Sequence, residues 1–211
     1  MNSTKTQDAP LERPLSWLRN RRIGDIIRNK SVLDFGCGIN GWTARSISSR
    51  VKLVHGYDPT LKEIKAFCNG VELFPDLSHL PLSNYEIVLA LAVFEHIEPF
   101  ILIDYLEILY DISAPTAIIF GTVPTPLSRP ILEYLAYKLK LVNASHIEDH
   151  KVYYDELWLK HILAKSSWKL KEYSKFQFGL NSEFLLVKKN KNNNLTRNIK
   201  NSNISLPSPK Q

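Results

Sequence analysis

The chain has 211 residues, 44% of them hydrophobic and 23% charged, a composition that supports one sizeable core and excludes a disordered or fibrous protein. Six basic residues and no acidic ones follow position 187, and these six account for the formal net charge of +6. The folded body therefore carries balanced charges, and net charge gives no reason to expect nucleic-acid binding. The two cysteines predict a reducing, cytoplasmic compartment, and no apolar run approaches the roughly 20 residues of a membrane span.

The two ends of the chain are polar and differ in composition from the middle. Residues 1–12 carry no hydrophobic pattern, and residues 190–211 are rich in Asn, Lys, Ser and Pro, so both ends are predicted to be disordered. A basic run between Arg13 and Lys30 suits a phosphate or an anionic membrane surface, although a solvated helix face explains it more simply. We expect one folded domain over residues 13–189.

Between the ends, short β-branched runs alternate with helical stretches, which is the pattern of a parallel sheet with crossover helices. The expected helices are Leu15–Arg28, one beginning near Trp42, Lys62–Cys68, Phe100–Asp111, Pro130–Leu141 and Tyr153–Ala164. The expected strands are Ser31–Phe35, Val51–Tyr57, Val71–Phe74, Tyr85–Ala92, Ala117–Gly121, Trp168–Phe176 and Glu183–Lys188. The fourth of these is almost continuously apolar, which predicts a central strand. No helix separates the last two, so we expect them to pair antiparallel at an edge of the sheet.

The clearest motif is SVLDFGCGING, in which a strand runs into glycines at 36, 38 and 41 before a helix begins. Glycines in such a turn accept unusual backbone angles and let a ligand approach the main chain. The spacing also fits a dinucleotide fingerprint, and Asp58 ends the next strand, where an acidic residue would bind ribose hydroxyls. The loop by itself leaves the identity of the nucleotide open.

Three neighbouring features narrow the choice of ligand. Asp34 precedes the first glycine by two residues, and a carboxylate there would repel a pyrophosphate but suits an amine or a sulfonium. Asp76 and Leu77 follow the third strand, at a position suited to contact an adenine ring. Glu95 and His96 follow the central strand at its carboxyl end, where open α/β sheets bind ligands. These residues are expected to converge on one crevice.

On VLDFGCG, GYDP, the stretch 76–81, LALAVFEHI and the strand-pair ending, the chain resembles class I S-adenosylmethionine-dependent methyltransferases over about residues 15–189. The resemblance implies a Rossmann-like α/β fold, with a seven-stranded, mostly parallel sheet, an antiparallel last strand and helices on both faces. It also implies S-adenosyl-L-methionine as the cofactor. Gly36 and Gly38 would line its methionine part, Asp58 would bind the ribose hydroxyls, and Asp76 would bind the adenine amine.

The second half, with TVPTPLSRPILEYLAYKL and DHKVYYDELWLKHIL, resembles methyltransferases that modify bacterial surface sugars and lipids. This implies that residues 124–150 form an insertion on the substrate side, with Asp149, His150 and Tyr153 near its mouth. His96 and His150 are the candidate bases that take a proton from an attacking hydroxyl, although His96 could instead cap the next helix or support the cofactor. The expected acceptor is an oxygen, less readily a nitrogen, of a small molecule, sugar or lipid-linked glycan.

Other patterns supply the competing hypotheses. Ala92 stands where an E-x-x-E-H metal cluster would begin, so no metal is expected. Tyr134 and Lys138 form the Y-x-x-x-K pair of short-chain NAD(P)-dependent oxidoreductases, although the surrounding stretch is an amphipathic helix. A non-catalytic binding module on the same fold is the other alternative. The same helix and the basic ends permit peripheral membrane contact, whereas the scattered tryptophans offer no platform for nucleic acid.

Overall fold

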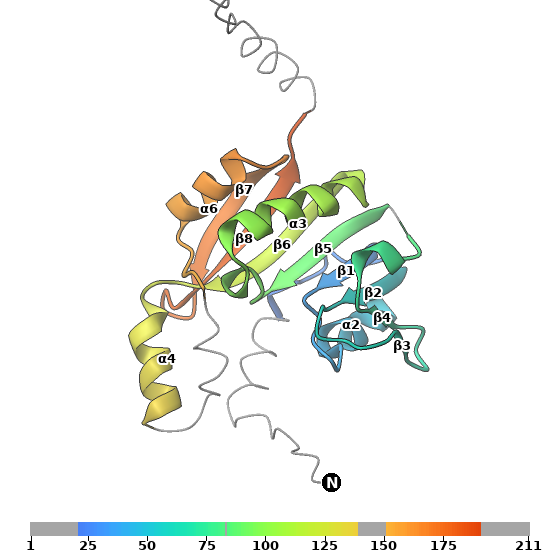
Figure 1. The fold of residues 1–211 in the computed structure, drawn as a ribbon, viewed down its shortest axis with the longest axis horizontal. Coiled ribbons are helices and arrows are strands. Elements are labelled where there is room, and N and C mark those ends of the chain that lie inside the picture. The colour runs from blue at the N-terminus through green and yellow to red at the C-terminus, as the bar shows by residue number, and fades with distance from the viewer. Residues whose placement is uncertain (1–20, 83, 139–150, 191–211) are drawn as a thin grey trace, which may run out of the picture.

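Eight strands form one mixed sheet in the computed structural model, which describes residues 21–82, 84–138 and 151–190 (Figure 1). Their order across the sheet is β3-β4-β2-β1-β5-β6-β8-β7. The strands are β1 (Ser31–Phe35), β2 (Leu53–Tyr57), β3 (Lys65–Ala66), β4 (Glu72–Phe74), β5 (Tyr85–Leu91), β6 (Ser113–Pro124), β7 (Trp168–Phe176) and β8 (Asn181–Lys188). The predicted α/β sheet is confirmed, with the short β3 as an additional strand at one edge.

The centre of the sheet is parallel, since β4, β2, β1, β5 and β6 pair in that direction with one another. All five residues of β1 are buried, as expected of a strand covered on both faces. The last two strands pair antiparallel, which confirms the prediction. β8 is not at the edge, however, because it also pairs antiparallel with β6 and leaves β7 as the outer strand.

The helix predicted over Lys62–Cys68 is wrong. This segment contains β3, which pairs antiparallel with β4 through Lys65 and Leu73. A tight turn joins the two strands: the Phe67 amide donates to the Val71 carbonyl, and Gly70 takes the left-handed φ of +75°. The Asn-Gly sequence at 69–70 is a strong hairpin signal, and it outweighs the helical spacing of the preceding apolar residues.

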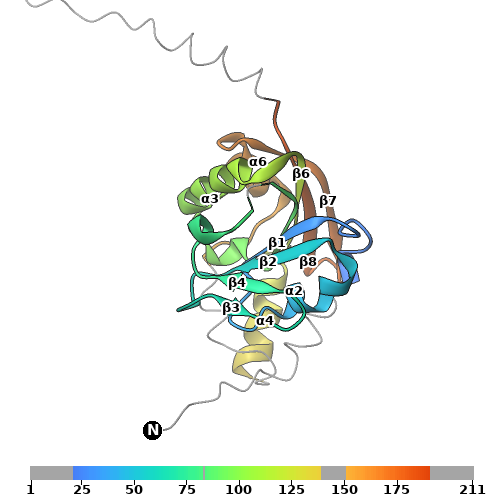
Figure 2. The same ribbon diagram turned by 90° about the vertical axis from the view of Figure 1, so that its right-hand side faces the viewer.

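Helices cover both faces of the sheet, as Figure 2 shows with α3 and α2 on opposite sides. Leu33 and Phe35 of β1 pack in a core cluster with α3 and α6, whereas Val32 packs in a second cluster with α2. Alternate residues of one strand therefore serve opposite cores. The helices are α2 (Trp42–Ile47), α3 (Pro99–Asp111), α4 (Ser128–Tyr137) and α6 (Glu156–Ala164), with 3-10 turns η1 (Ser48–Arg50), η2 (Leu77–His79) and η3 (Phe94–His96).

The first predicted helix ends earlier than expected. Residues 21–22 are helical, but residues 23–29 form turns, because Gly24 takes a φ of +59° that a helix cannot continue through. Residues 15–20 of that prediction lie outside the described residues, as do residues 139–141 of the predicted helix Pro130–Leu141. Within the described ranges, no helix is long and apolar enough to cross a bilayer.

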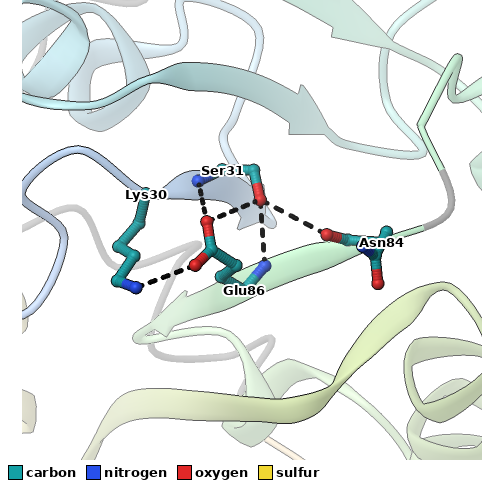
Figure 3. Close-up of polar contacts among 4 residues, drawn as sticks. All are labelled: Lys30, Ser31, Asn84 and Glu86. Atoms are coloured by element: carbon teal, nitrogen blue, oxygen red, sulfur yellow. Dashed lines mark hydrogen bonds and ion pairs between the residues drawn. The ribbon is translucent and has the colours of Figure 1, made fainter.

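A polar cluster fixes the amino ends of the two central strands (Figure 3). The Glu86 carboxylate accepts from Lys30 Nζ at 2.8 Å and from the Ser31 amide at 3.1 Å, and the Ser31 hydroxyl donates to the Asn84 carbonyl at 3.3 Å. The bonds to Lys30 and Ser31 hold the pKa of Glu86 below its usual value. Because β1 and β5 start in fixed register, their carboxyl ends also meet in a fixed arrangement.

Candidate active site

The carboxyl ends of the five parallel strands share one edge of the sheet, and the loops that follow them form the candidate site. These loops begin at residues 36, 58, 75, 92 and 125. In open α/β sheets ligands bind in the crevice outside the carboxyl ends, and this edge carries every predicted cofactor residue that follows a strand.

The glycine loop after β1 is closed on one side and open on the other. Gly36 has a φ of +78°, and a Cβ there would lie 2.4 Å from Cγ2 of Val93. Gly38 has a φ of +66°, but a Cβ there would meet no atom within 4 Å. The amides of Gly36 and Cys37 both donate to the Tyr57 carbonyl, at 2.8 and 3.0 Å. The loop is therefore held against the sheet at Gly36, while Gly38 borders free space that a ligand can use.

Asp58 joins the loops after β1 and β2. Its buried carboxylate accepts from the Gly38 amide at 2.8 Å through Oδ2 and from the Thr60 amide at 2.9 Å through Oδ1. The Thr60 hydroxyl donates to the same Oδ1 atom. Sequence inspection did not single out Thr60, although Asp-Pro-Thr after a strand is a pattern in which the Asp side chain bonds the backbone two residues on. The carboxylate keeps further lone pairs for ribose hydroxyls.

Asp34 lies beneath the glycine loop and is only 2% exposed. Its Oδ2 accepts from the Ala44 amide in the first turn of α2 at 3.0 Å. Burial raises the pKa of Asp34 to about 7, a rise that the Ala44 bond opposes and the nearby Asp58 carboxylate reinforces. A buried carboxyl with this pKa is partly protonated at neutral pH, and a cation bound beside it would favour its ionised form.

Asp76 and Leu77 have different environments at the end of β4. Asp76 is exposed and caps η2, since its Oδ1 accepts from the Ser78 amide at 2.8 Å, and this bond lowers its pKa. Leu77 is buried and packs in the same core cluster as α3. An ionised, exposed carboxylate at this strand end is available to accept from a ligand amine.

Glu95 and His96 lie in η3, directly after β5. Glu95 is 1% exposed, and its carbonyl accepts from the amides of Lys151 at 2.7 Å and Val152 at 3.3 Å. His96 is half-buried, and its amide donates to the Val93 carbonyl at 3.0 Å. The chain that returns after residue 150 is therefore fastened to the end of the central strand.

Two of the three residues that the sequence placed near the mouth lie outside the described residues: Asp149 and His150. Tyr153 is half-buried, and the Arg129 guanidinium lies 5.9 Å from the centre of its ring, which links the segment before α6 to α4. No group of three or more His, Cys, Asp or Glu side chains suited to a metal occurs in the part of the chain that the structure describes.

Two fully buried hydroxyls near this edge were not anticipated. Thr122, near the carboxyl end of β6, and Tyr154, before α6, have hydroxyl oxygens without a hydrogen-bond partner among the described residues. Burial, and to a lesser degree the Glu95 carboxylate, raises the pKa of Tyr154. A polar residue late in an apolar strand was the available signal for Thr122.

Tyr134 and Lys138, the Y-x-x-x-K pair, do not point toward this site. Tyr134 is 57% exposed, and Lys138 follows at the end of α4 and is also exposed. Figure 1 shows α4 projecting from the carboxyl edge, away from the glycine loop that precedes α2. Nothing in this geometry favours an oxidoreductase.

A parallel β1–β5 core, a glycine loop held by an acidic residue at the end of β2 and a last strand inserted antiparallel define the class I methyltransferase fold. The family model described as a methyltransferase domain matches residues 9–172, more than half of the chain, so the protein belongs to this family. The solved structures that share its fold include an S-adenosylmethionine-dependent methyltransferase from Mesorhizobium loti. A comparison with curated protein sequences finds no match.

Solved structures of methyltransferases and a biosynthetic protein share the fold at low identity. The pyocyanin biosynthetic protein PhzM superposes with a TM-score of 0.61 at 13% identity, over 82% of this chain and 55% of that chain, so the present chain spans about half of its length. Magnesium protoporphyrin IX methyltransferase from Synechocystis, with bound S-adenosylhomocysteine, gives 0.55 at 16% identity, over 84% and 83% of the two chains. The 1,6-didemethyltoxoflavin-N1-methyltransferase from Burkholderia thailandensis gives 0.58 at 15% identity, over 88% and 80%.

The residues at the carboxyl edge fit the cofactor. The open space beside Gly38 can hold a ligand, and any side chain at this position would occupy part of that space. The adjacent Asp58 carboxylate has remaining acceptor capacity. Asp34 supplies a buried acid below the same loop. A cation, a diol and an amine are the groups that such a set of acids binds best, and S-adenosylmethionine carries all three.

Proposed function

We propose that the enzyme methylates a hydroxyl oxygen of a small molecule, a sugar or a lipid-linked glycan, with His96 and His150 as the candidate bases. One hydrogen bond supports this most directly: the amide of Lys151, next to His150, donates to the carbonyl of Glu95, next to His96. The chain neighbours of both histidines are therefore in contact at the end of β5. Imidazoles titrate near neutral pH, which suits them to accept a hydroxyl proton.

In this proposal the acidic and glycine residues hold the cofactor. Gly36 and Gly38 border its methionine part, Asp34 favours its positive charge, and Asp58 accepts from the ribose hydroxyls. Asp76 and Leu77 lie on the adenine side of the cofactor, and Glu95 lies at the floor of the crevice. When bound, S-adenosylmethionine supplies a methyl group that its sulfonium makes electrophilic. The protein then has to orient the acceptor, and positioning of this kind lowers a barrier by roughly 7 to 11 kcal/mol.

The test uses His96→Ala, His150→Ala and the double variant, with His161→Ala on the exposed surface of α6 as the control. Turnover is measured as release of S-adenosylhomocysteine in the presence of phenols, amines, sugars and lipid-linked sugars, and cofactor affinity is measured by calorimetry. Loss of the base should lower turnover by about 10²- to 10⁴-fold with cofactor affinity nearly unchanged. Full turnover in the double variant would overturn the base assignment, and turnover with amines alone would replace oxygen by nitrogen as the acceptor atom.

A lipid-linked acceptor would bring the enzyme to the cytoplasmic face of a membrane, as a peripheral rather than an embedded protein. The geometry of α4 bears on this part of the proposal, since α4 follows β6 directly at the edge where the acceptor has to enter.

A further inference from the structure

An exposed apolar surface lies beside the acceptor edge and has no function in the site described above. It consists of Leu127, Ile131 and Tyr134 from the start and body of α4 and Phe178 from the turn between β7 and β8, with exposed fractions of 60%, 41%, 57% and 101%. We call these four residues the α4 patch. Large side chains this exposed are costly in water, and a cluster of them marks a contact surface.

The four residues come from two neighbouring segments. Leu127, Ile131 and Tyr134 are spaced by four and three positions, so they share one face of the helix. The turn is fastened to the start of this helix: the Thr125 hydroxyl donates to the Gly179 carbonyl at 2.7 Å, and Leu127 Cδ2 lies 3.8 Å from where a Cβ on Gly179 would be. The turn that carries Phe178 therefore lies beside the amino end of this helix face.

The backbone of the turn holds Phe178 outward at a conformational cost. Gln177 and Phe178 have φ values of +51° and +57°, in the left-handed region that disfavours any residue but glycine, and the Gly179 amide closes the turn on the Phe176 carbonyl at 3.1 Å. Since Phe178 is fully exposed, contacts with the described part of the chain do not compensate for this conformation. An unfavourable backbone that presents a solvated aromatic ring points to a partner outside the chain.

The shape and charge of the surface identify the partner as a lipid bilayer. Figures 1 and 2 both show α4 projecting beyond the sheet, a position that suits contact with an extended fluid interface. Exposed cations flank it: Lys138 follows Tyr134 by four residues on the same helix face, and Lys175 lies on β7 just before the turn. Apolar and aromatic residues bordered by basic ones are typical of surfaces that bind anionic membranes.

We infer that the α4 patch docks the enzyme on an anionic membrane, with Phe178, Leu127, Ile131 and Tyr134 inserted among the lipid headgroups and acyl chains. Docking in this way turns the carboxyl edge of the sheet toward the lipid, where α4 and the crevice share the same side. The inference deepens the proposed function, because a lipid-linked acceptor would enter from that surface. The docking itself requires neither the base assignment nor a particular acceptor.

The experiment is sedimentation of the full chain with vesicles of phosphatidylcholine alone or mixed with phosphatidylglycerol. Leu127→Asp combined with Phe178→Asp should lower the bound fraction at least tenfold on the anionic vesicles. Ile131→Asp is compared with Ile108→Asp, because both isoleucines lie on helices and are similarly exposed, at 41% and 42%. Ile108, however, lies near the carboxyl end of α3, which leads into the start of β6 and not toward the carboxyl edge of the sheet. Only Ile131→Asp should weaken binding. All variants keep the basic tail, so its contribution is constant.

Three further measurements exclude misfolding and separate this inference from the proposed function. Phe178→Gly should weaken vesicle binding while raising the melting temperature, which no unfolded variant would do. His96→Ala should bind vesicles like the wild type, and the patch variants should keep wild-type affinity for S-adenosylhomocysteine. Vesicle binding that the patch variants leave unchanged would overturn the inference. A concentration-dependent dimer that these variants dissociate, without vesicle binding, would replace the membrane by a second copy of the chain.

Discussion

The loops after β1 and β2 and the segment that begins at α4 lie along the same edge of the sheet, yet they are stabilised in different ways. In the first region Asp34 and Asp58 are buried and bonded to backbone amides at 2.8 to 3.0 Å. In the second, α4 turns Ile131 and Tyr134 to solvent. The proposed cofactor loops thus have a fixed backbone, whereas α4, which we propose lies on the acceptor side, is an appended element that can change without disturbing the sheet.

Asp58→Ala should give the largest effect. The substitution removes the acceptor of the Gly38 and Thr60 amides as well as the proposed ribose contact. Hydrogen bonds to charged groups contribute about 1.5 to 3 kcal/mol each, so we expect affinity for S-adenosylhomocysteine to fall about 100-fold. Calorimetric titration measures it, with Asp111→Ala at the exposed end of α3 as the control. A dissociation constant within threefold of the wild type would remove Asp58 from the cofactor site.

Gly36→Ala and Gly38→Ala test whether one glycine of the loop is needed for packing and the other for ligand space. Both substitutions incur the left-handed backbone penalty, but only at position 36 does the new methyl collide with Val93. Gly36→Ala should lower the free energy of unfolding by about 3 kcal/mol, and Gly38→Ala by about 1 kcal/mol. Gly38→Ala should instead weaken cofactor binding, because its methyl enters the open side. Urea denaturation measures the first effect and calorimetry the second; equal destabilisation by the two variants would contradict this division.

The pH dependence of cofactor affinity tests Asp34. Its pKa of about 7 means that a cationic ligand, which favours the carboxylate, must displace a proton at lower pH. Affinity should therefore fall as the pH drops below 7, by up to about tenfold per pH unit, and level off above 7. Asp34→Asn keeps an acceptor for the Ala44 amide and should abolish the slope in titrations from pH 5.5 to 8.5. The same slope in both proteins would assign it to another group.

The free energy of unfolding without ligand should also depend on the ionisation of Asp34, but it should fall as the pH rises, whereas cofactor affinity should rise. The folded pKa of Asp34 is raised from 3.8 to about 7, so the folded state binds more protons than the unfolded state between these values. This contribution to the free energy of unfolding is fully present below about pH 4 and is lost as the pH rises through 7. The difference between wild type and Asp34→Asn across that window, from urea denaturation, checks the sign.

Phe178→Gly should give the smallest effect, and in the stabilising direction. Glycine relieves the left-handed strain at this exposed turn, so the free energy of unfolding should rise by about 1 kcal/mol. Phe178→Ala is the matched control, because it removes the ring but keeps the Cβ that causes the strain. If alanine stabilises as much as glycine, ring exposure rather than backbone strain accounts for the gain.

Much of the structure of the first half of the chain was predictable because its sequence signals are local. The strand at 31–35, the glycines after it and the helix beginning at Trp42 follow one another within 17 residues, and the structure reproduces them. The short hairpin at β3 was missed because apolar spacing indicated a helix, while the Asn-Gly turn at 69–70 determined the outcome.

The second half of the chain was less predictable because its structure depends on contacts between residues that are distant in the sequence. The position of β8 between β6 and β7 depends on pairs such as Ile119 with Leu186, which no local pattern specifies. The bond between Lys151 and Glu95 likewise joins segments more than 50 residues apart. The Y-x-x-x-K spacing at 134–138 shows the converse, since a short motif can recur on an exposed helix without the geometry that its chemistry needs.

The cluster around Glu86 has a consequence for the order of assembly. Ser31 can pair with Leu53 of β2 soon after both leave the ribosome, but its bond to Glu86 waits for a residue 55 positions later in the chain. During that interval one edge of β1 is open in the nascent chain, with Lys30 beside it as a charge that discourages pairing with other chains. Loss of Glu86 would therefore remove a contact that holds this edge of β1 closed once β5 has been made.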